Sequence, residues 1–281
     1  MITEYNLQTR IKRSWNTLKC LLIIQWKYRK DFSLLNKTIR LAEKMILSKK
    51  IVWDDNDPFS KITISAMARN LQTTRAVRLL CRMGLGQDTL TQLRVMFEGI
   101  IDFGYMRANK TRIKDYIDFD LYYKLKMGRK LDKHKVEVKQ KEWEARQKEL
   151  ETEWNKVKSR FTYINHKGKE VVCSRWSCKD LRTMAEEIDM GKAYDYFYTY
   201  ASSFVHSMAA SANDYVLGRD GDSMVVEVGT SETMVSEALH TAQATLIAIL
   251  DIVNDEYKVG FNKEIEDLSP KLGKDDTMTK S

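Results

Sequence analysis

The scarcity of proline and glycine constrains this chain most: it has only 2 prolines and 12 glycines in 281 residues. These residues supply many of the turns that separate short strands, so a chain with so few of them favours long helices. Hydrophobic residues make up 43% of the sequence, which is enough to bury a substantial core. The sequence therefore predicts an all-α protein built as a multi-helix bundle.

Apolar residues recur at helical spacing through most of the chain, and polar segments separate these stretches. Gly84 and Gly86 are the expected end of one helix, because glycine adopts the left-handed conformation that follows many helices. Short extended pieces are expected only around 165–173 and 225–229. The expected helices cover residues 6–30, 33–49, 60–83, 88–108, 111–160, 178–188, 191–217 and 231–257.

The pattern of charge and hydropathy divides the chain into three expected parts. A basic helical pair at 1–58 precedes a helical core at 59–258, and a flexible polar tail follows at 259–281. The core includes a long charged arm at about 124–161, where residues 124–160 hold 13 basic and 7 acidic side chains. A seven-residue repeat in the arm either pairs with a second copy, giving a homodimer, or lies along its own domain. The repeat consists of Val136, Trp143, Leu150 and Val157, with Gln140, Gln147, Trp154 and Phe161 four residues after each.

The net charge of +8 is unevenly distributed along the chain. Residues 1–50 hold 12 Lys and Arg against 3 Asp and Glu, whereas residues 201–281 hold 6 against 14. A basic face attracts RNA or another phosphate-rich ligand. The oppositely charged ends can equally pack on one another or mediate head-to-tail association.

Several sequence features favour a cytoplasmic protein without a cofactor, a metal or a membrane partner. The four cysteines form no C-x-x-C pair and, with the four histidines, show no zinc-site spacing, so we expect reduced thiols. The N-terminus lacks the apolar region of a secretory signal. No apolar run approaches the roughly 20 residues that span a bilayer.

The segment LRVMFEGIIDFGYM, residues 93–106, is apolar around nearly its whole circumference, which predicts a buried helix. Its only charged residues are Arg94, Glu98 and Asp102, and their spacing of four places them on one face. Burying three charges is costly unless they are paired or face a wet cleft. Arg94 and Glu98 can pair locally, whereas Asp102 needs another partner. The stripe is either a structural salt-bridge network or part of a functional cleft.

A second stripe on a later helix consists of Tyr194, Tyr198, Ser202 and His206, again spaced by four. It brings hydroxyl groups and an imidazole to one face, although a lone histidine on such a face is more often structural than catalytic. Phosphate-binding loops, dinucleotide fingerprints, hydrolase elbows and H-E-x-x-H zinc motifs are all absent from the sequence. We expect the two stripes to meet in a cleft.

Three motifs in this order resemble a widespread bacterial family of all-helical proteins known only as a domain of unknown function. They are the R-x-x-x-E of residues 94–98, the tryptophan of SRWSCKDLRTMAEEI and the Y-x-x-x-Y-x-x-x-S-x-F-V-H of residues 194–206. The resemblance covers roughly residues 60–250 and implies no established activity. The site residues it implies are Arg94, Glu98, Trp176, Tyr194, Tyr198, Ser202 and His206.

The layout is more distantly similar to HEPN domains, helical bundles of bacterial toxins and antiviral systems in which an Arg-x(4–6)-His motif cleaves RNA without metal. This chain departs from that motif, because Tyr200 and Ala201 stand where the arginine would precede His206. Arg94, from another helix, would have to take its place.

Two functional hypotheses follow from these residues. The first is a helical ligand- or partner-binding module of a bacterial defence or regulatory system. The second is a HEPN-like metal-independent ribonuclease or toxin in which His206 is the general acid and base, Arg94 clamps the phosphate and Glu98 orients Arg94. The expected binding residues in either case are Asp102, Trp176, Tyr194, Tyr198 and Ser202.

Overall fold

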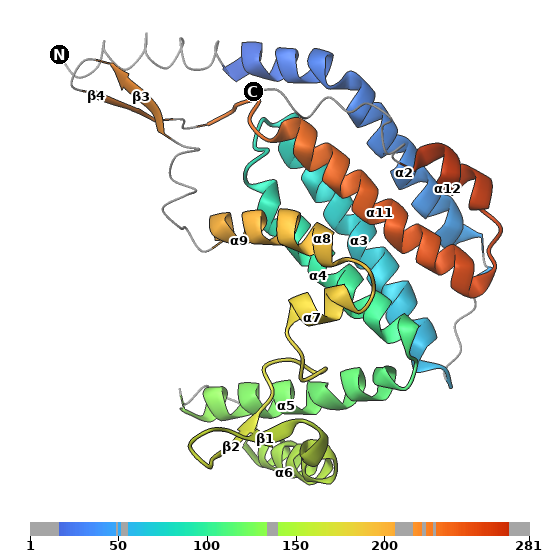
Figure 1. Cartoon of the computed structure of the whole chain (residues 1–281), viewed down its shortest axis with the longest axis vertical. Helices are drawn as coiled ribbons and strands as arrows, with labels where there is room; N and C mark the ends of the chain where they lie inside the picture. The colour runs from blue at the N-terminus through green and yellow to red at the C-terminus, as the bar shows by residue number, and fades with distance from the viewer. Residues whose placement is uncertain are drawn as a thin grey trace. The chain divides into compact units, whose positions relative to one another are not determined.

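The computed structural model describes residues 17–48, 50–51, 56–133, 140–205, 216–220, 223–226 and 229–269. Most of these residues are helical, which confirms the prediction of an all-α fold (Figure 1). The longer helices are α2 (Arg29–Leu47), α3 (Pro58–Arg82), α4 (Thr89–Ala108), α5 (Arg112–Lys133), α6 (Gln140–Val157) and α11 (Val235–Tyr257). The shorter ones are α7 (Leu181–Glu186), α8 (Gly191–Ala193), α9 (Thr199–Val205) and α12 (Asn262–Leu268).

Strands are few in the described part of the chain, and they form two antiparallel hairpins. The first joins β1 (Thr162–Ile164) to β2 (Glu170–Val172), close to the extended segment expected at 165–173. The second joins β3 (Val216–Asp220) to β4 (Ser223–Val226). The expected helix at 191–217 is therefore wrong at its C-terminal end, because Val216 already belongs to β3.

The chain divides into two compact units. The first contains the described residues of Met1–Ile100 and Asp195–Ser281, and the second is Ile101–Tyr194. This division differs from the expected parts 1–58, 59–258 and 259–281. Composition along the chain does not reveal it, because the first unit combines segments that are far apart in the sequence.

The core of the first unit forms where α11 packs against both α2 and α3 (Figure 1). The buried residues of α11 recur every three or four positions, which gives the helix a continuous apolar stripe. Each large aliphatic side chain buried in this way contributes about 1.5–3 kcal/mol. The stripe includes Leu239, Ala242, Leu246, Leu250 and Val253, all of which are at most 1% exposed.

The first unit also contains a folded segment where a flexible tail was expected from residue 259. Val259, Phe261 and Ile265 are buried, and α12 packs against α2 and α11. The buried Asn254 side chain accepts a hydrogen bond from the Phe261 backbone N–H at 2.8 Å. The prediction failed because it rested on the mean polarity of the segment, although three of its apolar residues are spaced so that they can be buried. Residues 270–281 lie outside the described part.

The ends of α3 follow from local sequence. Asp57 accepts hydrogen bonds from the backbone N–H groups of Phe59 and Ser60, and Pro58 occupies the first turn, where its missing N–H costs nothing. At the other end Gly84 has a φ of 70°, and the Leu85 N–H bonds to the carbonyl of Leu80. The predicted helix end at Gly84 and Gly86 is confirmed.

The N-terminal helix differs slightly from the expected helix at 6–30. The structure shows helix at 17–27 and α2 beginning at Arg29, while residues 1–16 lie outside the described part. Ile24 is buried. The apolar face expected on this helix is largely exposed, since Leu22 and Trp26 are 63% and 71% accessible.

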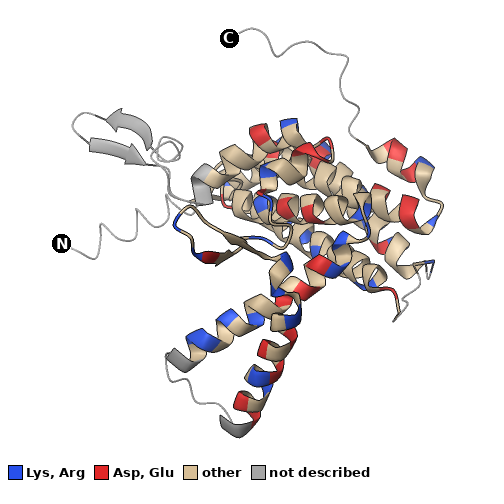
Figure 2. Ribbon diagram, turned by 60° about the horizontal axis from the view of Figure 1, so that its bottom comes forward, with Lys and Arg blue, Asp and Glu red and all other residues tan. Residues whose placement is uncertain are grey.

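In the second unit the charged arm is a helical hairpin rather than one long helix. α5 ends at Lys133, and α6 returns and packs along α5; the residues between them, 134–139, lie outside the described part. Lys, Arg, Asp and Glu occupy many positions on both helices (Figure 2). The turn was missed because the segment contains neither proline nor a suitably placed glycine.

The seven-residue repeat of the arm packs within the chain. Leu150 and Trp154 are each 6% exposed. The centroid of the Trp154 ring lies 5.4 Å from that of Tyr122 in α5 and 5.7 Å from that of Phe161. Phe119 of α5 contacts the rings of Trp154 and Phe161 as well. An aromatic cluster of α5, α6 and Phe161 thus accounts for the C-terminal part of the repeat. Val136 lies outside the described residues, and a homodimer through the arm stays a prediction.

The helix expected at 178–188 is shorter, because α7 covers only Leu181–Glu186 and is capped by Asp180, which accepts from the Thr183 N–H. None of the helices in the described part of the chain is long and apolar enough to cross a membrane.

Two glycines test the close packing of the first unit. A Cβ on Gly86 would overlap the backbone carbonyl of Thr233 and lie 2.7 Å from the Val235 backbone N, whereas a Cβ on Gly99 of α4 meets nothing within 4 Å. We expect Gly86→Ala to lower the free energy of unfolding by about 1–3 kcal/mol. Gly99→Ala should raise it by about 0.5–1 kcal/mol, because alanine is the better helix former. Denaturant unfolding measures both, and equal effects would contradict the packing described here.

Candidate functional site

The helix α4 places the first candidate residues in an apolar setting. Leu93, Met96, Phe97 and Ile100 are buried, whereas the side chains of Arg94 and Glu98 remain 18% and 29% exposed. The two charged residues are one helical turn apart, as their spacing predicts. They are therefore mostly withdrawn from water but still accessible.

Arg94, Glu98 and Tyr198 contact one another through hydrogen bonds, and we call this set the Arg94 cluster. The Arg94 Nε donates to Glu98 Oε1 at 3.0 Å, and its Nη2 donates to the Tyr198 hydroxyl at 2.9 Å. That hydroxyl donates to the same Glu98 Oε1 at 2.8 Å. Each member of the cluster thus fixes the other two, and α4 is joined to the helical segment that contains Tyr198.

The electrostatics of the cluster favour a charged arginine beside a neutral tyrosine. Burial lowers the pKa of the Arg94 guanidinium, but hydrogen bonds to Tyr198 and Glu98 outweigh burial, so this pKa is raised above its usual value. Burial raises the pKa of the Tyr198 hydroxyl, and the Glu98 carboxylate raises it further, while Arg94 acts in the opposite direction. At neutral pH the tyrosine is therefore a hydrogen-bond donor.

A π-helical turn at Tyr194–Tyr198 precedes α9 and presents Tyr198 to α4. Phe197, in the same turn, packs edge-on against Phe97 of α4 with ring centroids 5.4 Å apart. π-Helical turns are rare and occur often at functional sites. Tyr194 begins this turn and is half-buried.

The rest of the second stripe is described only in part. Ser202 lies one turn after Tyr198 in α9, and its Oγ is shielded from solvent without a hydrogen-bond partner among the described residues. Leaving a buried hydroxyl unsatisfied costs about 1–3 kcal/mol. His206 lies outside the described residues, so its expected meeting with Arg94 stays a prediction.

Asp102 takes part in a different set of contacts, the Asp102 cluster, in the second unit. Arg175 Nη2 donates to Asp102 Oδ1 at 3.0 Å and to Oδ2 at 3.1 Å. Trp176 Nε1 donates to Oδ1 at 2.9 Å. The carboxylate thus has the additional partner that its burial requires, and three hydrogen bonds satisfy it.

Trp176 anchors this cluster. Its side chain is 7% exposed and packs edge-on against Tyr105 of α4 and Tyr116 of α5, at 5.7 and 5.4 Å between ring centroids. Arg175 was not among the expected site residues. The signal that would have found it is its position beside Trp176 in the motif, together with the unmet need of Asp102 for a cation.

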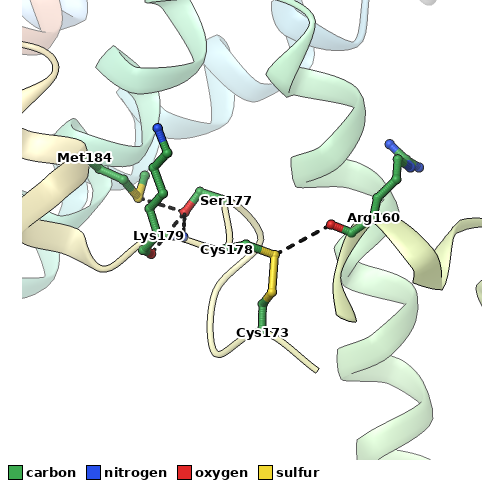
Figure 3. Close-up of a disulfide and its surroundings, with 6 residues drawn as sticks. All are labelled: Arg160, Cys173, Ser177, Cys178, Lys179 and Met184. Carbon is green, nitrogen blue, oxygen red and sulfur yellow. Dashed lines mark hydrogen bonds between the residues drawn. A yellow bond between two sulfur atoms is a disulfide. The ribbon is translucent and has the colours of Figure 1, made fainter. Parts of the chain in front are cut away.

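A disulfide between Cys173 and Cys178 closes the loop that contains Arg175 and Trp176 (Figure 3). The expectation of reduced thiols is wrong for this pair, because the loop folds back and brings the two side chains together. Ser177 supports the turn, since its Oγ accepts from the Lys179 N–H at 3.2 Å and lies 3.1 Å from the Met184 sulfur. Cys20 and Cys81 are not part of a disulfide.

Metal ligands do not gather in the part of the chain that the structure describes: it holds no group of three or more His, Cys, Asp or Glu residues placed to bind an ion. The chemistry available in the Arg94 cluster is hydrogen bonding and charge. A guanidinium and a phenol are the groups that recognise phosphate or carboxylate oxygens.

The disulfide should stabilise the second unit by restricting the unfolded chain. Its sequence separation of 5 corresponds to about 2 kcal/mol of loop-closure entropy. We expect dithiothreitol to lower the free energy of unfolding of the wild type by about this amount. The doubly substituted Cys173→Ser/Cys178→Ser protein should not respond. Cys20→Ser is the matched control and should respond as the wild type does; a wild type indifferent to reductant would exclude the bond.

Comparison with known proteins gives one match. No curated protein and no solved structure is significantly similar to the chain. A family model matches residues 60–224, from the first turn of α3 to the start of β4, and this range contains all residues of both clusters. The match covers more than half of the sequence. The chain therefore belongs to the family of unknown function DUF5677.

Proposed function

We propose that this protein is a helical ligand-binding module and that the Arg94 cluster is its binding site. The observation that carries the proposal is the set of mutual hydrogen bonds among Arg94, Glu98 and Tyr198, which are mostly buried and come from two helical segments. Charged groups held in one geometry bind a ligand without a further cost of ordering. The same contacts join the two helical segments, while 18% of the Arg94 side chain and 29% of the Glu98 side chain stay accessible to a ligand.

The unsatisfied hydroxyl of Ser202 supports the same assignment. Ser202 follows Tyr198 by one turn, so the two side chains lie on neighbouring positions of one helix face, about 5–6 Å apart. A ligand oxygen bound beside Tyr198 is within reach of a donor at that position. The cost of leaving the Ser202 Oγ without a partner would then be recovered when the ligand binds.

The donor set favours a phosphate-bearing ligand. A guanidinium presents parallel N–H groups that match two oxygens of a phosphate, and the unsatisfied hydroxyl of Ser202 adds a further donor. Glu98 accepts a hydrogen bond from Arg94 Nε and so holds the guanidinium plane in position. A small ligand such as a nucleotide fits a site in which 18% of the arginine side chain is accessible better than an extended duplex does.

The alternative is a metal-independent ribonuclease. It is favoured by the bond from Arg94 to Tyr198, because Tyr198 lies on the helical segment that leads toward His206. In this alternative His206 accepts the proton of the ribose 2′-hydroxyl and returns one to the leaving oxygen. Arg94 would stabilise the charge that develops on the phosphate.

A role in bacterial defence or regulation and a homodimer formed through the arm are further parts of the proposal, and both rest on sequence motifs alone.

Nucleotide binding tests the main proposal. Each nucleoside 5′-monophosphate at millimolar concentration is added to the wild type, to Arg94→Gln and to Arg69→Gln, and the midpoint of thermal unfolding is measured. A ligand that binds only the folded state raises this midpoint. We expect at least one nucleotide to stabilise the wild type and Arg69→Gln, which alters an exposed arginine of α3, but not Arg94→Gln. Stabilisation that persists in Arg94→Gln would reject the site.

Expression in bacteria separates the two functions. The binding module predicts that wild type, His206→Ala and His166→Ala leave growth and total RNA equally unaffected. The ribonuclease predicts degraded RNA and slow growth with wild type and with His166→Ala, whose side chain is exposed in the hairpin of the second unit, but not with His206→Ala. Degradation that survives His206→Ala would remove that residue from the chemistry.

A further inference from the structure

We propose that a groove between α2 and α3 is a second binding site, for a multiply charged phosphate group. This groove shares no residue with the Arg94 cluster. Most of its residues precede residue 60 and therefore lie outside the segment that the family model matches. The site is thus a feature of this chain that the family assignment does not provide.

The groove is a hollow of about 290 Å³ in the first unit. This volume lies at the lower end of the range of roughly 300–1,000 Å³ that is usual for small-molecule sites. Its lining contains four cationic side chains, three polar ones and one ring, and no carboxylate. The lining residues are Gln25, Arg29, Phe32, Ser33, Asn36, Lys37, Arg40 and Arg82.

Helical spacing explains why these cations gather. Arg29, Ser33, Lys37 and Arg40 follow one another at intervals of three or four along α2, so they share one face of that helix. Arg82, in the last turn of α3, adds a fourth cation from the opposite wall. The groove therefore collects positive charge from two helices.

These four cations have no carboxylate partner among the described residues. Elsewhere on the same helices cations are paired: Arg75 binds Glu43 at 2.6 Å and Lys44 binds Glu264 at 3.1 Å. The nearby carboxylate does not pair with the groove: Glu43 lies only three residues beyond Arg40, but its ion-pair partner is Arg75. Adjacent positive charges without counter-charges repel one another, and a bound anion relieves that repulsion.

A neighbouring arginine reports the same excess of positive charge. Burial lowers the pKa of the Arg78 guanidinium, and the charges of Arg82 and Arg75 lower it further. Arg78 donates to the Asn36 Oδ1 at 2.5 Å, which leaves the amide nitrogen of Asn36 as the group of that side chain able to donate to a ligand.

Two of the arginines are held in place by aromatic rings. The Arg82 guanidinium lies 5.6 Å from the centroid of the Phe32 ring, which is almost fully buried. Arg29 lies 5.6 Å from the Trp26 ring and donates to the Trp26 carbonyl at 3.3 Å. A guanidinium that contacts a ring through its face keeps its N–H groups, which lie in its own plane, available to phosphate oxygens.

Four cations require a ligand with several negative charges, which a single carboxylate does not supply. A chain of phosphates provides them at close spacing, either as a free polyphosphate or as the backbone of single-stranded RNA. A free polyphosphate and an RNA backbone present the same phosphate groups to the groove but differ in chain length. One probe of each kind therefore distinguishes them.

The test uses the full chain with two probes, inorganic tripolyphosphate measured by calorimetry and a fluorescent 12-nucleotide RNA measured by anisotropy. We expect saturable binding of at least one probe by the wild type. The double variant Arg40→Gln/Arg82→Gln should bind about tenfold or more weakly. Lys30→Gln, a charge change on an exposed α2 residue outside the groove, should bind as the wild type does. Circular dichroism checks that both variants are folded.

Each outcome decides the proposal. Binding of tripolyphosphate without RNA assigns the site to a free polyphosphate; binding of RNA that tripolyphosphate displaces assigns it to a nucleic-acid backbone. For RNA, loss of two phosphate contacts should reduce the salt slope by roughly 1.4, at about 0.7 per contact. No saturable binding of either probe would overturn the inference. The inference would also be overturned if Lys30→Gln weakened probe binding as much as the double variant does. The same holds if Arg94→Gln weakened probe binding and the double variant did not.

Discussion

The structure depends on how α4 satisfies the charges that it carries into an apolar environment. A charged side chain buried without partners destabilises the fold by several kcal/mol, so each one dictates what must be placed beside it. Arg94 and Glu98 are satisfied by one another and by Tyr198, which fixes the helical segment 194–205 against α4. Asp102 is satisfied by Arg175 and Trp176, which fixes the loop closed by the disulfide. Three polar positions on one helix thereby determine the placement of two distant segments.

Much of the fold follows from the sequence because apolar periodicity is a local property. The ends of α3 and α4 were predicted closely: helices were expected at 60–83 and 88–108, and Gly84 ends the first of them. The failures have a common cause, which is that tertiary packing decided the outcome. The arm turns back because Leu150 and Trp154 find an apolar surface on α5, and the segment after residue 259 folds because Phe261 and Ile265 find one in the first unit. No local signal records such surfaces.

The candidate site was predictable in its components but not in its partners. Spacing by four identified Arg94, Glu98 and Tyr198, and the structure brings these three together. The cation that binds Asp102 was missed among 47 Lys and Arg, and its one local signal is the position of Arg175 beside Trp176 in the motif. The π-helical turn that presents Tyr198 was also missed, since its sequence continues the pattern of an α-helix. The disulfide was missed for a related reason: Cys173 and Cys178, five positions apart, are bonded only if the loop between them folds back.

Two groups of arginines in this protein have different partners, which the net charge does not reveal. Arg94, Arg160 and Arg175 each bind a carboxylate and hold an element of the fold in place. Arg29, Arg40 and Arg82 line a groove whose lining residues include no carboxylate. A protein gains nothing in stability by gathering like charges, because they repel in the folded state and separate on unfolding. Their presence in one groove is therefore better explained by an anion outside the chain than by the fold itself.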